Sequence, residues 1–242
     1  MTGLLASVSD TREALLALAG GADIIDLKDP ARGALGAVPA EIQRQVVQLI
    51  GGRRPVSATV GDLPMNPACL TAAVLRTAAT GVDLVKIGLY DLPAGMDCVT
   101  TLGQTCAQQV PLIAVLFADQ QPDLDWLPDL AAAGFHGVML DTADKAAGRL
   151  LQHASIETLQ AFVQRAHGLG LLTGLAGSLR IEDIPTLLPL AADYLGFRGA
   201  LCVGRRRTGS LSMAAIAAAR SRISQREQPV DTVLRDTVPG CC

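Results

Sequence analysis

The sequence predicts an α/β protein, a single-domain (β/α)8 or TIM barrel over residues 1–224 with a C-terminal tail over residues 225–242. Three observations predict this fold. The chain has 242 residues, and one such barrel needs ~250. Short apolar runs alternate with helical patterns, and near-continuous apolar strands are typical of parallel sheets covered on both faces. A related turn sequence recurs at residues 21, 81, 134 and 191, before every second strand, which favours a closed barrel over an open sheet.

The first half of the chain contains four strand–helix units. We expect strands at residues 4–9, 22–28, 55–60 and 82–88, and helices at 11–19, 40–50, 68–79 and 99–109. Asp10 is the expected cap of the first helix, and Glu13 completes a capping box of the Asp type. The recurring turn, Gly-Ala-Asp at residue 21, lets a helix end and a strand begin at once.

The second half repeats the pattern. We expect strands at residues 111–117, 137–141, 171–175 and 194–198, and helices at 123–133, 156–169, 181–188 and 212–222. The residues after about 222 are polar and have no periodicity, which indicates a tail.

Composition excludes several classes of protein. Hydrophobic residues make up 50% of the chain and aromatic residues 3%, so the core is expected to be aliphatic. A net charge of −3 argues against disorder and against nucleic-acid binding. No run reaches the ~18 apolar residues of a membrane span, and the N-terminus does not resemble a signal peptide. The six cysteines show no CxxC pair, so we expect reduced thiols and a cytoplasmic protein. Cys241 and Cys242 are assigned no role.

Only three of the 20 basic residues are lysines, namely Lys28, Lys86 and Lys145. Arginine can replace lysine on a solvated surface, but not where an amine must lose its proton. All three lysines fall at or just after the ends of predicted strands, where barrel enzymes place their reactive groups.

Carboxylates accompany these lysines. Asp26 and Lys28 are two residues apart on one strand and therefore share a face, which we expect to point into the barrel with Ser7 or Ser9 and Ser57 or Thr59. Asp141 ends the sixth strand, four residues before Lys145. Carboxylates keep some amines protonated while burial and repulsion lower the pKa of another, which gives the neutral amine that Schiff-base chemistry needs. The alternative is a set of structural ion pairs, Lys28 with Asp26 among them, and a solvated Lys145.

The loops after the seventh and eighth strands are candidate phosphate sites, as in many barrels of this class. They contain Gly177 and Ser178, then Arg198, Gly199 and Ala200. Glycine allows close backbone approach, free N–H groups bind anions, and an arginine adds a cationic fork. The alternative is an ordinary strand-to-helix turn. The Arg205–Arg207 run is more typical of a solvated face, although it could attract anions.

No metal or cofactor is expected. The three histidines lack metal-ligand spacing, and no dinucleotide or phosphate-binding glycine fingerprint is present. Pro30, Gly33 and Gly36 follow Lys28 and indicate either a mobile lid or a long turn. Aliphatic barrels with apolar outer helices often associate, so we expect a homo-oligomer.

The chain resembles the (5-formylfuran-3-yl)methyl phosphate synthase family over residues ~4 to ~210. The stretches that carry the resemblance are GGADIIDLKDP (20–30), GA (36–37), VGDLP (60–64), DLVKIGLY (83–90), MLDTADK (139–145), LAGS (175–178), EDIP (182–185) and RGA (198–200). The chain departs from the family at Asp29, where an amide is common, and in its extended C-terminus.

The resemblance implies an activity and residue roles. The family activity would be the condensation of two glyceraldehyde 3-phosphate molecules into a furan phosphate, with loss of phosphate and water, in the biosynthesis of a methanofuran-type cofactor. It implies that Lys28 forms the Schiff base, that Lys86 accepts a proton, and that Asp26, Asp141 and Lys145 complete the site. Two alternatives stay open: another class I aldolase or isomerase acting on triose phosphates, and a non-catalytic barrel that binds phosphorylated metabolites.

Overall fold

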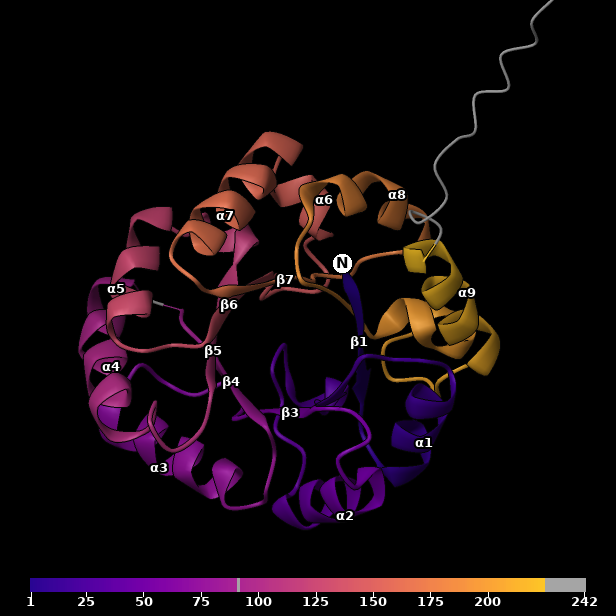
Figure 1. The fold of residues 1–242 in the computed structure, drawn as a ribbon, viewed down its shortest axis with the longest axis horizontal. Coiled ribbons are helices and arrows are strands. Elements are labelled where there is room, and N and C mark those ends of the chain that lie inside the picture. Colours follow the sequence, from indigo (N-terminus) through magenta and orange to yellow (C-terminus); the bar gives the residue numbers. More distant parts are fainter. Residues whose placement is uncertain (91, 225–242) are drawn as a thin grey trace, which may run out of the picture.

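The computed structural model describes residues 1–90 and 92–224, without the side chains of residues 92–94. Eight parallel strands form a closed barrel in sequence order, and the helices surround it (Figure 1). This confirms the predicted fold class. The predicted tail, residues 225–242 with Cys241 and Cys242, lies outside the described residues.

The strands are short and each pairs with its neighbours in the sequence, β8 closing on β1. They are β1 Gly3–Val8, β2 Ile24–Leu27, β3 Val56–Thr59, β4 Leu84–Gly88, β5 Leu112–Phe117, β6 Gly137–Asp141, β7 Leu172–Leu175 and β8 Tyr194–Phe197.

The α-helices follow the strands and cover the outside of the barrel. They are α1 Thr11–Ala19, α2 Ala40–Ile50, α3 Pro67–Ala78, α4 Leu92–Thr105, α5 Leu127–Ala132, α6 Leu150–His153, α7 Ile156–Gly168, α8 Ile184–Leu187 and α9 Met213–Ser224. The 3-10 helices are η1 Pro30–Arg32, η2 Ala118–Gln120, η3 Leu124–Trp126, η4 Ile181–Asp183, η5 Leu188–Leu190, η6 Gly199–Leu201 and η7 Val203–Arg205.

The recurring turn has a physical explanation. Its first residue has a left-handed backbone in all four copies: Gly21, Gly81, Gly134 and Ala191. In three copies the aspartate two residues later accepts the first free N–H of the preceding strand: Asp23 from Leu4, Asp83 from Val56, and Asp193 from Thr173, each at 2.7 Å. The repeat therefore ties neighbouring strands together at the N-terminal end of the barrel, away from the predicted site.

Side-chain alternation separates two apolar regions. Leu4, Ala6 and Val8 point from β1 towards the helices, whereas Leu5 belongs to a smaller cluster inside the barrel with Phe117 and others. Ile25 and Leu27 likewise pack against the helices, so Asp26 between them faces the barrel interior, as the alternation of β2 predicts.

Some predicted elements differ from the structure. The helix expected at residues 99–109 is α4, which begins at Leu92 and ends at Thr105; Pro93 near its start favours the first turn of a helix. The helices expected at 123–133 and 181–188 each begin as a 3-10 turn and continue as a short α-helix. The short helix α6 was not predicted, because four residues carry too little periodicity.

The predicted capping box at α1 is wrong in one half. The Asp10 carboxylate accepts the Glu13 N–H at 2.8 Å, as a cap does. The Glu13 carboxylate accepts the N–H of Ser9 instead of that of Asp10, and it also binds Arg198. The carboxylate that the capping box would use is therefore shared by Ser9 and by Arg198, a residue 185 positions away in the chain.

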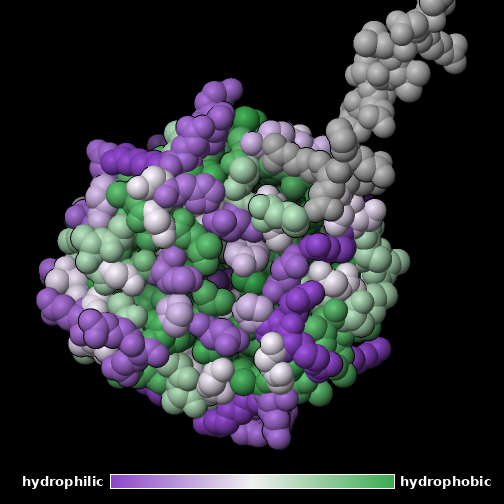
Figure 2. All heavy atoms as spheres, viewed as in Figure 1, coloured by the Kyte–Doolittle hydropathy of each residue, from purple (hydrophilic) through white to green (hydrophobic). Residues whose placement is uncertain are grey.

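The surface mixes hydrophilic and hydrophobic residues on the face seen along the barrel (Figure 2). None of the described helices combines the length and the apolar character needed to cross a membrane.

Candidate active site

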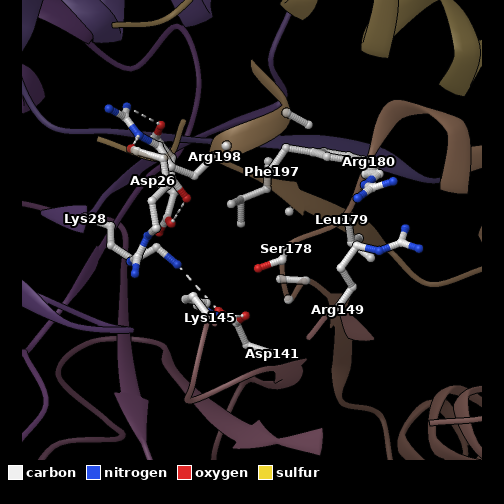
Figure 3. Close-up of a pocket in the computed structure, with 18 of the residues that line it drawn as sticks. Asp26, Lys28, Asp141, Lys145, Arg149, Ser178, Leu179, Arg180, Phe197 and Arg198 are labelled. Atoms are coloured by element: carbon white, nitrogen blue, oxygen red, sulfur yellow. Dashed lines mark hydrogen bonds and ion pairs between the residues drawn. The ribbon is translucent and has the colours of Figure 1, made fainter. Parts of the chain in front are cut away.

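A pocket of about 400 Å³ opens at the C-terminal ends of the strands. All ten residues predicted for catalysis or phosphate binding line it: Asp26, Lys28, Lys86, Asp141, Lys145, Gly177, Ser178, Arg198, Gly199 and Ala200. In Figure 3, Asp26, Lys28 and Arg198 lie on one side, and Ser178, Leu179, Arg149 and Arg180 on the other. The volume is in the range of small-molecule sites.

Asp26 and Lys86 form a buried ion pair at the floor of the pocket. Lys86 Nζ lies 2.6 Å from Asp26 Oδ1, and the two side chains are 3% and 0% exposed. Ser57 donates to Oδ1 at 2.7 Å and Ser7 to Oδ2 at 2.8 Å. The structure thus selects Ser7 and Ser57 from the predicted alternatives, because Thr59 donates to backbone carbonyls instead.

Lys28 does not pair with Asp26, so the alternative of a structural Lys28–Asp26 ion pair is wrong. Its Nζ lies 3.5 Å from Asp141 Oδ2, and its side chain is 9% exposed. Lys145 donates to Asp141 Oδ1 and to the carbonyl and hydroxyl of Thr142, so it is not solvated either. Asp141 therefore bridges Lys28 and Lys145.

The five charged groups perturb one another. Burial in itself raises the pKa of Asp26, but the charges of Lys86 and Lys28 outweigh it and lower that pKa. Burial also raises the pKa of Asp141, and Lys145 and Lys28 lower it well below the usual range. Burial lowers the pKa of Lys86 and of Lys145 despite their carboxylate partners, and the charge of Lys28 lowers both further. Three amines thus share two carboxylates that stay ionised, so the cluster contains one amine more than it has carboxylate partners.

The loop after β7 offers free backbone N–H groups. Among the described residues, the amides of Gly177, Ser178 and Leu179 have no acceptor. Gly177 has φ +104°, and a Cβ there would lie 3.0 Å from Thr142 Cγ2 and 3.2 Å from Leu150 Cβ. Only glycine fits this turn, and the resulting row of amides is suited to an anion.

The loop after β8 adds two more such groups. Gly199 and Ala200 begin η6, and the first N–H groups of a helical turn have no partner within it. Residues of both loops therefore line the same pocket.

Arg198 lines the pocket, but its guanidinium is fully used within the protein. It donates to both Glu13 oxygens and to the carbonyls of Ser7, Arg207 and Gly209. An arginine has five N–H donors, and all five are engaged. The expected cationic fork for phosphate is therefore not available from Arg198, which instead holds the loop after β8 in place.

Sequence reasoning missed several arginines of the pocket wall. The sequence offers no motif at Arg149 or Arg180, and the Arg205–Arg207 run is more typical of a solvated face. Arg149, Arg180, Arg205 and Arg207 all line the pocket. The one feature of the sequence that could have indicated these arginines is that they follow strands β6, β7 and β8.

The loop after β2 is a long, anchored turn. Asp62 accepts the Leu35 N–H at 3.0 Å, and Arg207 donates to the Gly33 carbonyl at 2.7 Å. Pro30, Ala34 and Leu35 are buried. These contacts fasten the loop to its neighbours after β3 and β8.

No group of three or more histidine, cysteine, aspartate or glutamate side chains within the described residues could hold a metal ion. His167 binds Asp193 at 2.8 Å, at the end of the barrel opposite the pocket.

The fold and the pocket define a (β/α)8-barrel enzyme with a buried amine–carboxylate cluster. The chain matches the family model described as 4-HFC-P synthase over residues 4–220. It therefore belongs to the 4-HFC-P synthase family, as the sequence resemblance predicted.

Individual relatives agree with this assignment. The chain is 44% identical over 216 residues to a protein of Methylorubrum extorquens, 89% of each chain, whose name assigns it provisionally as a (5-formylfuran-3-yl)methyl phosphate synthase. It is 39% identical over 221 residues to the (5-formylfuran-3-yl)methyl phosphate synthase of Methanopyrus kandleri, covering 86% of this chain and 93% of that one. The enzyme of the same name from Methanosarcina mazei is 37% identical over 218 residues, with 85% and 92% covered.

Solved structures share the fold. Phosphoribosyl anthranilate isomerase from Thermus thermophilus aligns with a TM-score of 0.66 at 16% identity, over 93% of this chain and 100% of that one. A 3-hexulose-6-phosphate synthase aligns with a TM-score of 0.64 at 18% identity, over 91% and 100%. At such identities the similarity is one of fold alone.

Proposed function

We propose that this protein condenses two molecules of glyceraldehyde 3-phosphate into (5-formylfuran-3-yl)methyl phosphate, with loss of one phosphate and water, through a Schiff base on Lys28. The product would serve the synthesis of a methanofuran-type cofactor. The observation that carries the proposal is the cluster of three amines and two carboxylates on the floor of one pocket.

Lys28 is the amine best suited to covalent chemistry. Lys86 and Lys145 each have a close carboxylate partner, whereas the nearest acceptor of Lys28 is 3.5 Å away. Lys28 in its neutral form is the nucleophile, while Lys86 and Lys145 are paired with Asp26 and Asp141. One glyceraldehyde 3-phosphate isomerises to its ketone form, and the Lys28 amine attacks its carbonyl. Lys86 supplies the proton with which the oxygen leaves as water, so a protonated iminium and a neutral Lys86 result.

The iminium acidifies the adjacent C–H bond. Neutral Lys86 removes this proton, and the resulting enamine adds to the aldehyde carbon of the second triose phosphate. Asp26, held by Ser7 and Ser57, keeps Lys86 in position. Asp141 and Lys145 then move the protons that ring closure, dehydration and loss of phosphate require.

The phosphate of the first triose is proposed to bind the free amides of Gly177, Ser178, Gly199 and Ala200. Arg180 lines the same pocket two residues after Ser178 and supplies positive charge on that side. Arg198 supports this site through Glu13 and does not touch the phosphate.

Reductive trapping tests the proposal. Wild-type protein incubated with triose phosphate and borohydride should gain the mass of one reduced adduct on a peptide containing Lys28, and without reductant it should form a furan that absorbs in the ultraviolet. Lys28→Arg should abolish both and keep the fold by circular dichroism. Arg206→Lys is the control, since Arg206 is exposed.

The remaining outcomes distinguish the alternatives. Trapping on Lys28 without a furan product would indicate a simpler aldolase or isomerase. Saturable binding of triose phosphate without either would indicate a barrel that only binds such metabolites.

A further inference from the structure

The proposed condensation brings two phosphate groups into one pocket, and the amides after β7 and β8 account for one of them. The inference below rests on the proposed function and concerns the second phosphate. A second dianion needs positive charge that the protein has not already neutralised.

Most arginines of the pocket wall are neutralised by carboxylates. Arg149 pairs with Asp183 at 2.9 Å, Arg198 with Glu13, and Arg205 with Glu182. Arg180 has no ion pair with a described residue, but it is exposed and lies with Arg149 and Leu179 on the side of the pocket away from Lys28 (Figure 3).

Arg207 is different. It is half-buried and forms no ion pair with any described residue. Its side chain forms one hydrogen bond with a described residue, from Nη2 to the Gly33 carbonyl at 2.7 Å, which leaves the other donors of its guanidinium free. A half-buried guanidinium without a counter-ion is costly unless a ligand supplies one.

The side chain of Arg207 reaches across the mouth of the pocket. Its backbone lies beside Gly199 in the loop after β8, 3.8 Å from the Cβ position of that glycine, whereas its guanidinium contacts the loop after β2. The carboxylates whose charges act on it are Asp141 at the end of β6 and Asp62 in the loop after β3. Its charge also acts on Lys145, and Arg207 lines the same pocket as the amine cluster.

We propose that Arg207 binds the phosphate of the second triose phosphate, on the β2–β3 side of the pocket, opposite the backbone site after β7. The first phosphate would be held by amides and the second by this guanidinium, with the reacting carbons between them above Lys28.

Two readouts separate the two subsites. Borohydride trapping on Lys28 requires only the first triose, whereas furan formation requires both. In Arg207→Gln, the triose phosphate concentration for half-maximal furan formation should rise at least about tenfold, the usual effect of losing a charged hydrogen bond. The concentration for half-maximal trapping should change less than about twofold. For Arg207→Lys, the concentration for half-maximal furan formation should lie between those of the wild type and Arg207→Gln, because lysine keeps the charge but lacks the forked guanidinium.

The matched control is Arg206→Gln, which removes the same charge from an exposed neighbour and should change neither concentration. Unchanged trapping also shows that the loop carrying Lys28 keeps its place without the Gly33 contact. Equal rises in both concentrations, or no rise in either, would overturn the assignment.

An independent measurement does not require turnover. Equilibrium dialysis with labelled inorganic phosphate should find two phosphates per wild-type chain, two for Arg206→Gln and one for Arg207→Gln. A single phosphate on the wild type, or no difference between the variants, would overturn the proposal for Arg207. Absence of trapping and furan in the wild type would instead contradict the proposed function, while the dialysis result still decides the role of Arg207.

Discussion

Replacing Asp26 with asparagine should destabilise the protein strongly, and more so at lower pH. Asp26 is 0% exposed and its partner Lys86 3% exposed, so the variant leaves an ammonium group buried without its counter-ion. Removing one partner of a buried pair costs about 3–5 kcal/mol. For a chain of this size, 1 kcal/mol corresponds to about 2–4 °C in Tm, so we expect Tm to fall by roughly 6–20 °C near neutral pH.

The pKa of Lys86 determines how the stability loss of Asp26→Asn changes with pH. Burial already lowers the pKa of Lys86 from 10.5, and loss of Asp26 lowers it further. A folded pKa below the unfolded one means that the unfolded chain binds the proton first as pH falls, so stability is lost in that direction. The gap between Asp26→Asn and wild type should therefore narrow as pH rises towards 10.5.

The assay is thermal unfolding followed by circular dichroism over a pH series, with Lys86→Met combined with Asp26→Asn as the matched double variant. Because this pair removes the uncompensated charge, it should recover much of the lost stability. A fall in Tm below about 2 °C for Asp26→Asn, or a fall that is the same at every pH, would refute the reasoning.

Two further predictions concern the site. Gly177→Ala should cost about 1–3 kcal/mol in unfolding free energy and weaken phosphate binding measured by dialysis, because φ is +104° and the added Cβ meets Thr142 and Leu150. The control is Gly170→Ala, at φ +74° with open space around it, which should cost less and leave phosphate binding unchanged. Equal losses of stability in both variants would contradict the steric argument. The rate of furan formation should rise as the pH passes the lowered pKa of Lys86, because only the neutral amine removes a proton. A pH–rate profile whose acid-side midpoint lies at or above 10.5, the ordinary pKa of lysine, would exclude Lys86 as the base.

The barrel could be predicted because its signals are local. Apolar runs, the recurring glycine turn and the caps each act over a few residues, and the structure shows the same backbone conformation at Gly21, Gly81 and Gly134. The predicted helix boundaries were wrong where local signals are weak, as at α4. The predicted capping box was wrong where a tertiary contact is involved, since Glu13 binds Arg198.

The sequence predicted which residues line the pocket, but not which amine pairs with which carboxylate. Strand ends and alternation place Asp26, Lys28 and Lys86 in one pocket, because parallel strands all end at the same rim. Which amine meets which carboxylate depends on side-chain reach across the barrel, so the pairing of Asp26 with Lys86 and of Asp141 with Lys28 and Lys145 came only from the structure. The free guanidinium of Arg207 likewise depends on where the other arginines find partners.

The Glu13–Arg198 contact joins residues 185 positions apart, and Glu13 also accepts the N–H of Leu211. During translation, the glutamate leaves the ribosome long before either partner does. Until the last strand and its loop emerge, that carboxylate has Ser9 as a partner but lacks the arginine that balances its charge, so burial of the first helix against the barrel is less favourable. The contact therefore couples packing of the first helix to formation of the loop after β8, and we expect a chain cut short before Arg198 to keep its N-terminal helix loose and to be proteolysed more readily.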